Sequence, residues 1–224
     1  LVAMMAEGKA LGELAKSGWR PKRTIIHAAW DGEEQGLLGS TEWAEHHADE
    51  LKDKAVAYIN SDSNSNGYLG VGGSHSLEQL VNDVARDVDD PSVDATILER
   101  KLALRQLTGT PEQKQEAANR KNLRISPLGS GSDYTTFLQH LGIASLNLGF
   151  GGEGDYGVYH SIYDSFDHYT KFMDRDFRYG VTLAKTAGRL VLRLSESEAP
   201  VFRFSGFLDS LSTYVDQVEK LSDR

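Results

Sequence analysis

Two adjacent acids, Glu33 and Glu34, are the residues whose type and placement point most directly to chemistry. They follow an apolar, β-branched run at residues 23–30 and precede the glycine-rich residues 36–39. Such a run predicts a buried strand, and in open α/β sheets ligands bind outside the carboxyl ends of strands. Because successive side chains of an extended segment point in opposite directions, one carboxylate can bind a cation while its neighbour faces a water on that cation.

An isolated acidic pair is also typical of an exposed turn, but two further segments end in residues of the same kind. A predicted strand at residues 55–60 leads to Asp62, and a third at residues 143–148 leads through a glycine-rich loop to His160. Carboxylates and neutral imidazole are ligands that zinc accepts, with one position left open for water in a catalytic site. The pattern therefore predicts a metal site at one edge of a sheet.

Periodic apolar residues and caps predict the helices around these strands. Five are expected at residues 1–17, 39–51, 76–88, 132–140 and 174–195. The last should face the core with one stripe: Phe177, Val181, Ala184, Gly188 and Val191. A further apolar stripe follows Pro200 and predicts a helix to the chain end: Phe207, Leu208, Leu211, Val215 and Val218.

Two stretches are expected to carry little regular structure. Residues 70–73 are almost all glycine and predict a turn. Residues 91–123 are polar and charged, and we expect a solvated insertion there with one short capped helix at residues 110–120.

Composition excludes several classes of protein. With 224 residues the chain is long enough for one sizeable α/β domain. A net charge of -9 argues against a nucleic-acid surface, and no apolar run reaches the roughly 18 residues that a membrane segment needs. The absence of cysteine excludes disulfides, cysteine-zinc sites and a thiol nucleophile.

Four ordered blocks make the chain resemble the co-catalytic zinc peptidases of the glutamate carboxypeptidase II and transferrin-receptor-like branch. The blocks are residues 30–43 (WDGEEQGLLGSTEW), 57–62 (AYINSD), 129–133 (GSGSD) followed by 141–145 (LGIAS), and 159–161 (YHS). The resemblance covers nearly the whole chain. It implies a three-layer α/β/α fold with a central mixed, mainly parallel sheet, truncated at the N-terminus.

The same resemblance implies a role for each acid and for the histidine. Glu33 would be the general base and acid, Glu34 and His160 would bind one zinc ion, and Asp62 would bind the second. The implied reaction is hydrolysis of peptide bonds in small peptides by a zinc-activated water. Glu33 would remove a proton from that water and return it to the leaving amine.

Further residues receive roles from the resemblance alone. Tyr159 would donate a hydrogen bond to the developing oxyanion, and the loop with Ser130 and Gly131 would line the substrate cleft. Glu42 and Glu45 match positions that help to bind a structural calcium ion, which stays a hypothesis here. Residues 1–199 would form a partial catalytic domain, and residues 200–224 would begin a helical domain of the dimerisation type, which implies a homodimer.

Two parts of the family pattern are missing. The resemblance implies a further histidine and a metal-bridging aspartate, but no histidine precedes His27 and no aspartate precedes Asp31. The chain is therefore expected to be a fragment without a complete two-zinc site. Residues 67–70 and 146–149 contain no arginine, although glutamate-selective members carry arginines there. A general aminopeptidase or dipeptidase is thus as good an expectation as a carboxypeptidase for acidic peptides.

Two alternatives to a zinc exopeptidase remain open. The first is a catalytically silent, receptor-like interaction domain on the same scaffold. The second is a nucleotide-binding oxidoreductase, because residues 149–154 match the spacing of a dinucleotide fingerprint, although residues 155–159 read as a continuing loop and not as the required helix. The resemblance also implies an extracytoplasmic location: periplasmic, secreted or in a membrane-anchored ectodomain.

Overall fold

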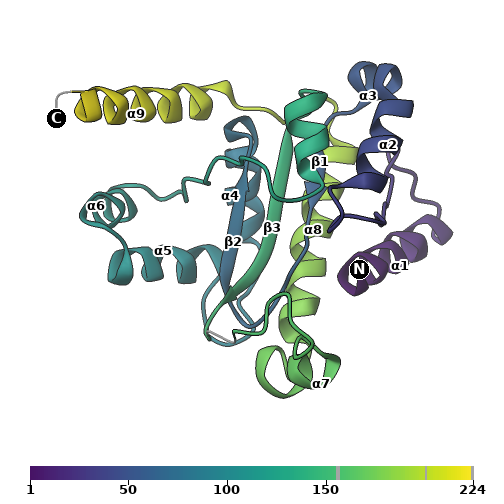
Figure 1. Ribbon diagram of the computed structural model, residues 1–224, viewed down its shortest axis with the longest axis horizontal. Helices are drawn as coiled ribbons and strands as arrows, with labels where there is room; N and C mark the ends of the chain where they lie inside the picture. The colour runs from purple at the N-terminus through teal and green to yellow at the C-terminus, as the bar shows by residue number, and fades with distance from the viewer. Residues whose placement is uncertain (155–156, 200, 223–224) are drawn as a thin grey trace.

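A three-stranded sheet lies at the centre of the molecule in the order β1-β3-β2 (Figure 1). β1 (Tyr58–Asn60) runs parallel to β3 (Ser145–Gly152), and β2 (Gly67–Gly73) runs antiparallel to β3. The prediction of a mixed sheet is confirmed, but the sheet is not mainly parallel, since its described strands make one pairing of each kind. This computed structural model describes residues 1–154, 157–199 and 201–222.

Helices follow and precede these strands along the chain. The main ones are α1 (Val2–Lys16), α2 (Leu38–His46), α3 (Ala48–Lys54), α4 (Glu78–Arg86), α5 (Ile97–Thr108), α6 (Pro111–Asn119), α8 (Arg178–Glu196) and α9 (Phe204–Ser222). Shorter helical turns are η1 (His75–Leu77), η2 (Thr136–His140), α7 (Phe166–His168) and η3 (Tyr169–Met173). The five predicted helices are present with shifted ends, and the one predicted at residues 39–51 is divided into α2 and α3.

Alternating side chains divide the core between the two faces of the sheet. The larger cluster holds Leu146, Leu148 and Phe150 of β3 together with buried residues of α4 and α8. On β1, Ile59 packs against this cluster, whereas Tyr58 packs against the smaller one, which α2 and η2 help to form. Helices therefore cover both faces, which confirms the three-layer α/β/α arrangement.

Strand β2 was predicted as a turn because it is rich in glycine, and that prediction is wrong. β2 pairs with β3 along its whole length. A Cβ at Gly67 would lie 2.2 Å from the carbonyl oxygen of Gly151, and a Cβ at Gly73 would lie 2.3 Å from that of Ser145. Both glycines also have positive φ angles. The glycines are needed so that the two backbones can approach each other.

The strand predicted at residues 23–30 is also wrong. No residue of this segment pairs in the sheet, and Ile26 is 65% exposed. Side chains hold the segment instead: the Trp30 indole N–H, for example, donates to the hydroxyl of Tyr58 at 3.0 Å. β-branched residues favour extended backbone, but a strand also requires a partner that supplies the other half of the hydrogen bonds.

The segment at residues 91–123 is not simply a solvated insertion. The capped helix predicted within it is confirmed as α6. However, α5 was missed, and its residues Ile97 and Leu98 are buried in the larger core cluster. The overlooked signal is a capping box, in which the Thr96 hydroxyl accepts from the Glu99 amide while the Glu99 carboxylate accepts from the Thr96 amide.

The face of helix α8 that packs against the core is not the stripe that was predicted. Phe177 and Val181 are 45% and 53% exposed, whereas Leu183 is buried. Thr182 and Thr186 are buried too, because each hydroxyl donates to a backbone carbonyl one turn earlier at 2.8 Å. A threonine that is satisfied in this way packs like an apolar residue, so a stripe read from apolar residues alone is displaced around the helix.

Helix α9 projects from the body of the protein at the left of Figure 1. Its predicted apolar stripe is exposed over its length, at Phe207, Leu208, Leu211, Val215 and Val218. No helix of the described chain is long and apolar enough to cross a bilayer. Three earlier predictions lie outside the described residues: the domain boundary at Pro200, the loop at residues 155–156 and the helix end at Arg224.

Candidate active site

Glu33 and Glu34 lie in a tight turn that leads into α2. The Gly39 amide donates to the carbonyl of Asp31 at 2.9 Å, and the Leu37 amide donates to the carbonyl of Glu33 at 2.8 Å. A Cβ at Gly39 would lie 2.6 Å from the same Asp31 oxygen. Glycine is therefore required for this turn to close, and the closed turn presents Glu34 to solvent and leaves Glu33 half-buried.

The loop after β3 brings His160 to Glu34. The Nε2 atom of His160 lies 3.0 Å from Oε1 of Glu34, and the two side chains are 54% and 65% exposed. His160 has a φ angle of 57°, in the left-handed region that few non-glycine residues adopt. Backbone strain of this kind concentrates at functional sites. Two segments that are far apart in the sequence thus place a nitrogen and an oxygen ligand type side by side.

Asp62 follows β1 and is oriented by a chain of hydrogen bonds. Its Oδ1 atom accepts from the Ser132 hydroxyl at 2.7 Å and from Asn60 Nδ2 at 3.0 Å. The Asn60 side-chain oxygen accepts from the Tyr58 hydroxyl at 2.9 Å, which in turn accepts from the Trp30 indole. No described residue donates to Oδ2 of Asp62, so this oxygen is the one left for another partner.

Glu33 is electrostatically coupled to the other candidates. Partial burial raises the pKa of Glu33, and three neighbouring carboxylates raise it further: those of Glu34, Asp133 and Asp62. The nearby imidazole of His160 lowers it. A raised pKa brings a carboxylate closer to the range in which it can accept and return a proton near neutral pH.

Asp133 is a residue of this region to which sequence reasoning gave no role. It is buried, and its Oδ1 atom has no hydrogen-bond partner among the described residues. Burial raises the pKa of Asp133, a hydrogen bond with Ser40 lowers it, and the charge of Asp62 raises it. A buried carboxylate oxygen without a partner marks a place where a water or cation belongs. The available signal was its position directly after Ser132 in the third sequence block.

The predicted substrate-binding residues lie near this region but do not yet enclose a substrate. The Tyr159 ring stacks on the His160 ring with centroids 3.8 Å apart, and Tyr159 is 78% exposed. The Ser130 hydroxyl accepts from that of Thr135 at 3.1 Å. Gly131 follows with a φ angle of 133°, two residues before Asp133.

The described residues hold no complete metal cluster. Across residues 1–154, 157–199 and 201–222, no three histidine or acidic side chains are placed so that they could hold one ion. Glu42 and Glu45 are exposed on α2 without a further acidic group that would complete a site. Calcium binding there stays a prediction.

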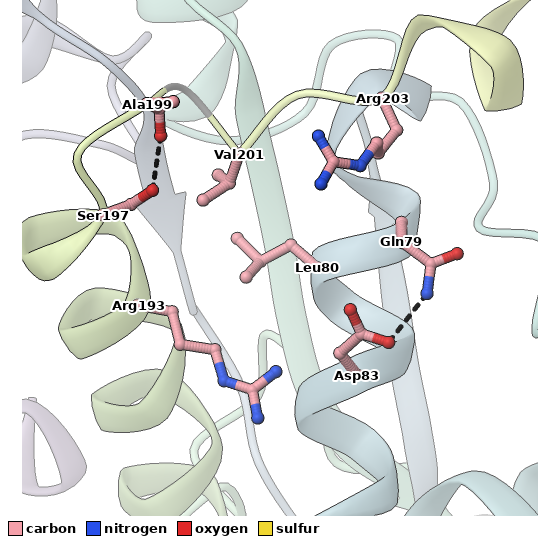
Figure 2. A pocket seen from close by; sticks show the side chains of 8 residues that line it. All are labelled: Gln79, Leu80, Asp83, Arg193, Ser197, Ala199, Val201 and Arg203. Carbon is pink, nitrogen blue, oxygen red and sulfur yellow. Dashed lines mark hydrogen bonds between the residues drawn. The ribbon is translucent and has the colours of Figure 1, made fainter.

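A cavity of about 360 Å³ lies elsewhere, between α4, α8 and the segment that leads to α9 (Figure 2). Its lining residues are Gln79, Leu80, Asp83, Arg193, Ser197, Ala199, Val201 and Arg203. None of the predicted site residues belongs to this lining. The Gln79 amide donates to Asp83 at 2.7 Å, as the dashed line in Figure 2 shows. The chemistry of the predicted site therefore does not take place in this cavity.

The family of the chain is shown by comparison with known protein families. Peptidase family M28 matches residues 2–178, which is most of the chain. The protein belongs to this family. Peptidases of family M28 depend on a metal ion, usually zinc.

Individual relatives of this M28 chain are peptidases by name. It is 34% identical over 219 residues to Probable glutamate carboxypeptidase LAMP1 of Arabidopsis thaliana, covering 96% of this chain and 30% of the relative. It is 32% identical over 222 residues to Aminopeptidase NAALADL1 of Mus musculus, covering 95% of this chain and 29% of the relative. The chain thus spans less than a third of the length of these relatives.

A solved structure that aligns with the M28 chain is the Aminopeptidase from Aneurinibacillus sp. strain AM-1. The alignment has a TM-score of 0.48 and 18% sequence identity, and it covers 78% of this chain and 34% of the other.

The side chains of this M28 chain fit part of a zinc site. Glu34 and His160 supply an oxygen and a nitrogen of the types that zinc accepts, and they already lie 3.0 Å apart. Asp62 keeps one oxygen free, and its orientation is fixed by Ser132 and Asn60. Oriented carboxylates of this kind are typical of metal sites. Glu34 and His160 would hold one ion and Asp62 would hold another, and this assignment stays a prediction because no three such groups of the described residues lie around one point.

Proposed function

We propose that the protein hydrolyses peptide bonds in small peptides as a zinc-dependent exopeptidase, with carboxypeptidase, aminopeptidase or dipeptidase action. The observation that supports this most strongly is the contact between His160 Nε2 and Glu34 Oε1, next to Glu33, in a chain of family M28. Water activation by a metal and a neighbouring carboxylate needs this set of groups.

Glu33 is placed to move the proton. When bound, zinc supplies a Lewis acid that lowers the pKa of a water and polarises the substrate carbonyl. The Glu33 carboxylate takes a proton from the attacking water and delivers it to the leaving amine nitrogen as the C–N bond breaks. The Tyr159 hydroxyl, in the loop beside His160, donates a hydrogen bond to the oxygen of the tetrahedral intermediate.

The receptor-like alternative is not favoured. A silent scaffold has no need to keep a metal site, whereas Glu33, Glu34, Asp62 and His160 are all present in this chain. The number of zinc ions, a structural calcium ion, a homodimer and an extracytoplasmic location stay predictions from the resemblance.

Metal removal tests the proposed function. Peptide hydrolysis is measured on the longest form of the protein that its gene encodes, with a set of unblocked and amino-blocked dipeptides as substrates. We expect activity to fall to background after dialysis against a chelator and to return with added zinc. Hydrolysis that survives complete metal removal would contradict the proposal.

A further inference from the structure

A second cavity, of about 350 Å³, lies over the paired strands β2 and β3 and includes Asp62 in its lining. Its floor is one face of the sheet, where three cross-strand pairs meet: Tyr68 with Gly151, Gly70 with Gly149 and Gly72 with Asn147. Four of these six residues are glycines, so missing side chains leave space above the strands. The lining of the cavity therefore combines the candidate metal ligand Asp62 with strand residues that are mostly glycine.

Lys101 of α5 is the one cationic side chain in the lining of this cavity, all of which the structure describes. Lys101 is half-buried, and no described carboxylate forms an ion pair with it. Burial lowers the pKa of Lys101, and the nearby Arg105 lowers it further. A partly buried ammonium group without a counter-charge is unfavourable unless an anion is supplied.

Other groups of the lining can also donate hydrogen bonds to an anion. The Asn147 side-chain oxygen accepts from Asn60 Nδ2 at 3.2 Å, which leaves the Asn147 NH₂ group free to donate. The Tyr68 ring lies 4.6 Å below the Arg100 guanidinium, and no described residue takes the hydrogen of its hydroxyl. Although the protein as a whole has a net charge of -9, this cavity is lined by an ammonium group, an amide and a hydroxyl that can donate hydrogen bonds. Such a set of donors is suited to an anion.

We propose that Lys101 binds a carboxylate of the peptide substrate in this cavity and so determines specificity. The carboxylate comes from an acidic side chain or from the peptide C-terminus, since both offer the same chemistry to an ammonium group. The inference rests on the proposed peptidase function, because the lining of the cavity includes Asp62, the residue proposed to bind a metal ion. Residues 67–70 and 146–149 contain no arginine, and the cation comes instead from α5, beside β2.

Three dipeptides that differ in their carboxylates test the proposal. They are Ala-Gln-amide, Ala-Gln and Ala-Glu-amide, titrated calorimetrically into the full chain with added zinc. We expect Ala-Gln or Ala-Glu-amide to bind about tenfold more tightly than Ala-Gln-amide, as a charge-assisted hydrogen bond implies. The peptide that shows the preference identifies the source of the carboxylate. In Lys101→Met that preference should disappear, while the affinity for Ala-Gln-amide stays within about twofold.

Matched variants keep the test decisive. Lys114→Met removes an exposed lysine of α6 and should keep the preference, and Lys101→Arg should retain most of it because the charge is kept. Equal affinity of the wild-type chain for all three peptides would overturn the proposal, and so would a preference that persists in Lys101→Met. If all three peptides bind with equal affinity and are hydrolysed with equal kcat/KM, the role of Lys101 is rejected and the peptidase function stands. If a carboxylate preference is found without hydrolysis, only the peptidase function is rejected.

Discussion

The Ser132 hydroxyl orients Asp62, and its loss should weaken metal binding without unfolding the protein. In Ser132→Ala the Oδ1 atom of Asp62 loses its 2.7 Å hydrogen bond, and the carboxylate can rotate away from a bound ion. We expect zinc affinity to fall by about tenfold or more, as for other partners that orient metal ligands. Competition with a chromophoric chelator measures the effect. Ser126→Ala, at an exposed serine of the same segment, is the control, and equal losses in both variants would remove the special role of Ser132.

Glu7 of α1 provides a test by pH. Burial raises the pKa of Glu7 above its ordinary value of 4.5, although the hydrogen bond and charge of His27 lower it. The protonated form is therefore favoured in the folded state, and this stabilisation is complete below pH 4.5 and is lost as the pH rises through the folded-state pKa.

Glu7→Gln cannot ionise, so its free energy of unfolding should rise relative to wild type as the pH is raised from about 4 to 7. Urea titrations at several pH values measure the difference. Glu13→Gln, on the exposed face of the same helix, is the control. A difference that shrinks with rising pH would show that the paired, ionised Glu7 is the favoured form.

At the scale of single residues, the sequence indicated the acids and the histidine, whose roles stay predictions, but not the residues that contact them. Glu33, Glu34 and Asp62 closely follow apolar runs, and His160 follows the glycine-rich loop after a third run. Asp133 and Lys101 carry no such signal. Asp133 could have been noticed only by its place after Ser132 in the third sequence block, whereas the place of Lys101 depends on the pairing of β2 and on α5.

The pairing of β2 with β3 depends on glycine at the strand ends. In Gly73→Ala the new methyl group would lie 2.3 Å from the Ser145 carbonyl oxygen, on a backbone with a φ angle of 154°. We expect the free energy of unfolding to fall by about 2 to 3 kcal/mol, measured by chemical denaturation. Gly12→Ala, in α1 with no atom within 4 Å of the added Cβ, should have a neutral or stabilising effect. Equal stability of the two variants would contradict the role assigned to Gly73.

At the scale of elements, helices that are set by local caps can be predicted from the sequence, whereas strands that need a distant pairing partner cannot. Capping boxes predicted α6 and could have predicted α5, because a cap is formed within one turn of chain. The segment at residues 23–30 and strand β2 could not be assigned by residue type. Whether either becomes a strand depends on a partner far away in the sequence.

At the scale of the whole molecule, α9 is attached by a few polar contacts. The Asp209 carboxylate accepts hydrogen bonds from Arg120 at 2.8 Å and from Arg124 at 2.9 Å. The Tyr214 hydroxyl lies 2.9 Å from the His75 ring nitrogen. The exposed apolar stripe of α9 adds little to this attachment, since it faces away from the body.

Asp209→Asn should therefore loosen α9 selectively. Removing a partly exposed charge from two ion pairs costs about 1 kcal/mol, which corresponds to roughly fivefold faster hydrogen exchange of the α9 amides. The amides of α8 should exchange as in wild type. Asp216→Asn, on the exposed surface of α9, is the control. Unchanged exchange in Asp209→Asn would show that other contacts hold the helix.

The fold class and family of the whole chain could be predicted from the sequence, because four blocks in fixed order identify them. The position of α9 could not be predicted. An apolar stripe shows that a helix has a face to cover, but it does not show which surface lies against that face.

Substitution of Glu33 by glutamine tests the central claim most directly. Glutamine keeps the size of the side chain but cannot take a proton from water, so peptide turnover should fall by at least about 10²-fold. The zinc content should stay nearly equal to that of wild type, because Glu34, Asp62 and His160 are unchanged. Turnover close to wild type in Glu33→Gln, with zinc still bound, would contradict the assignment of Glu33 as the base.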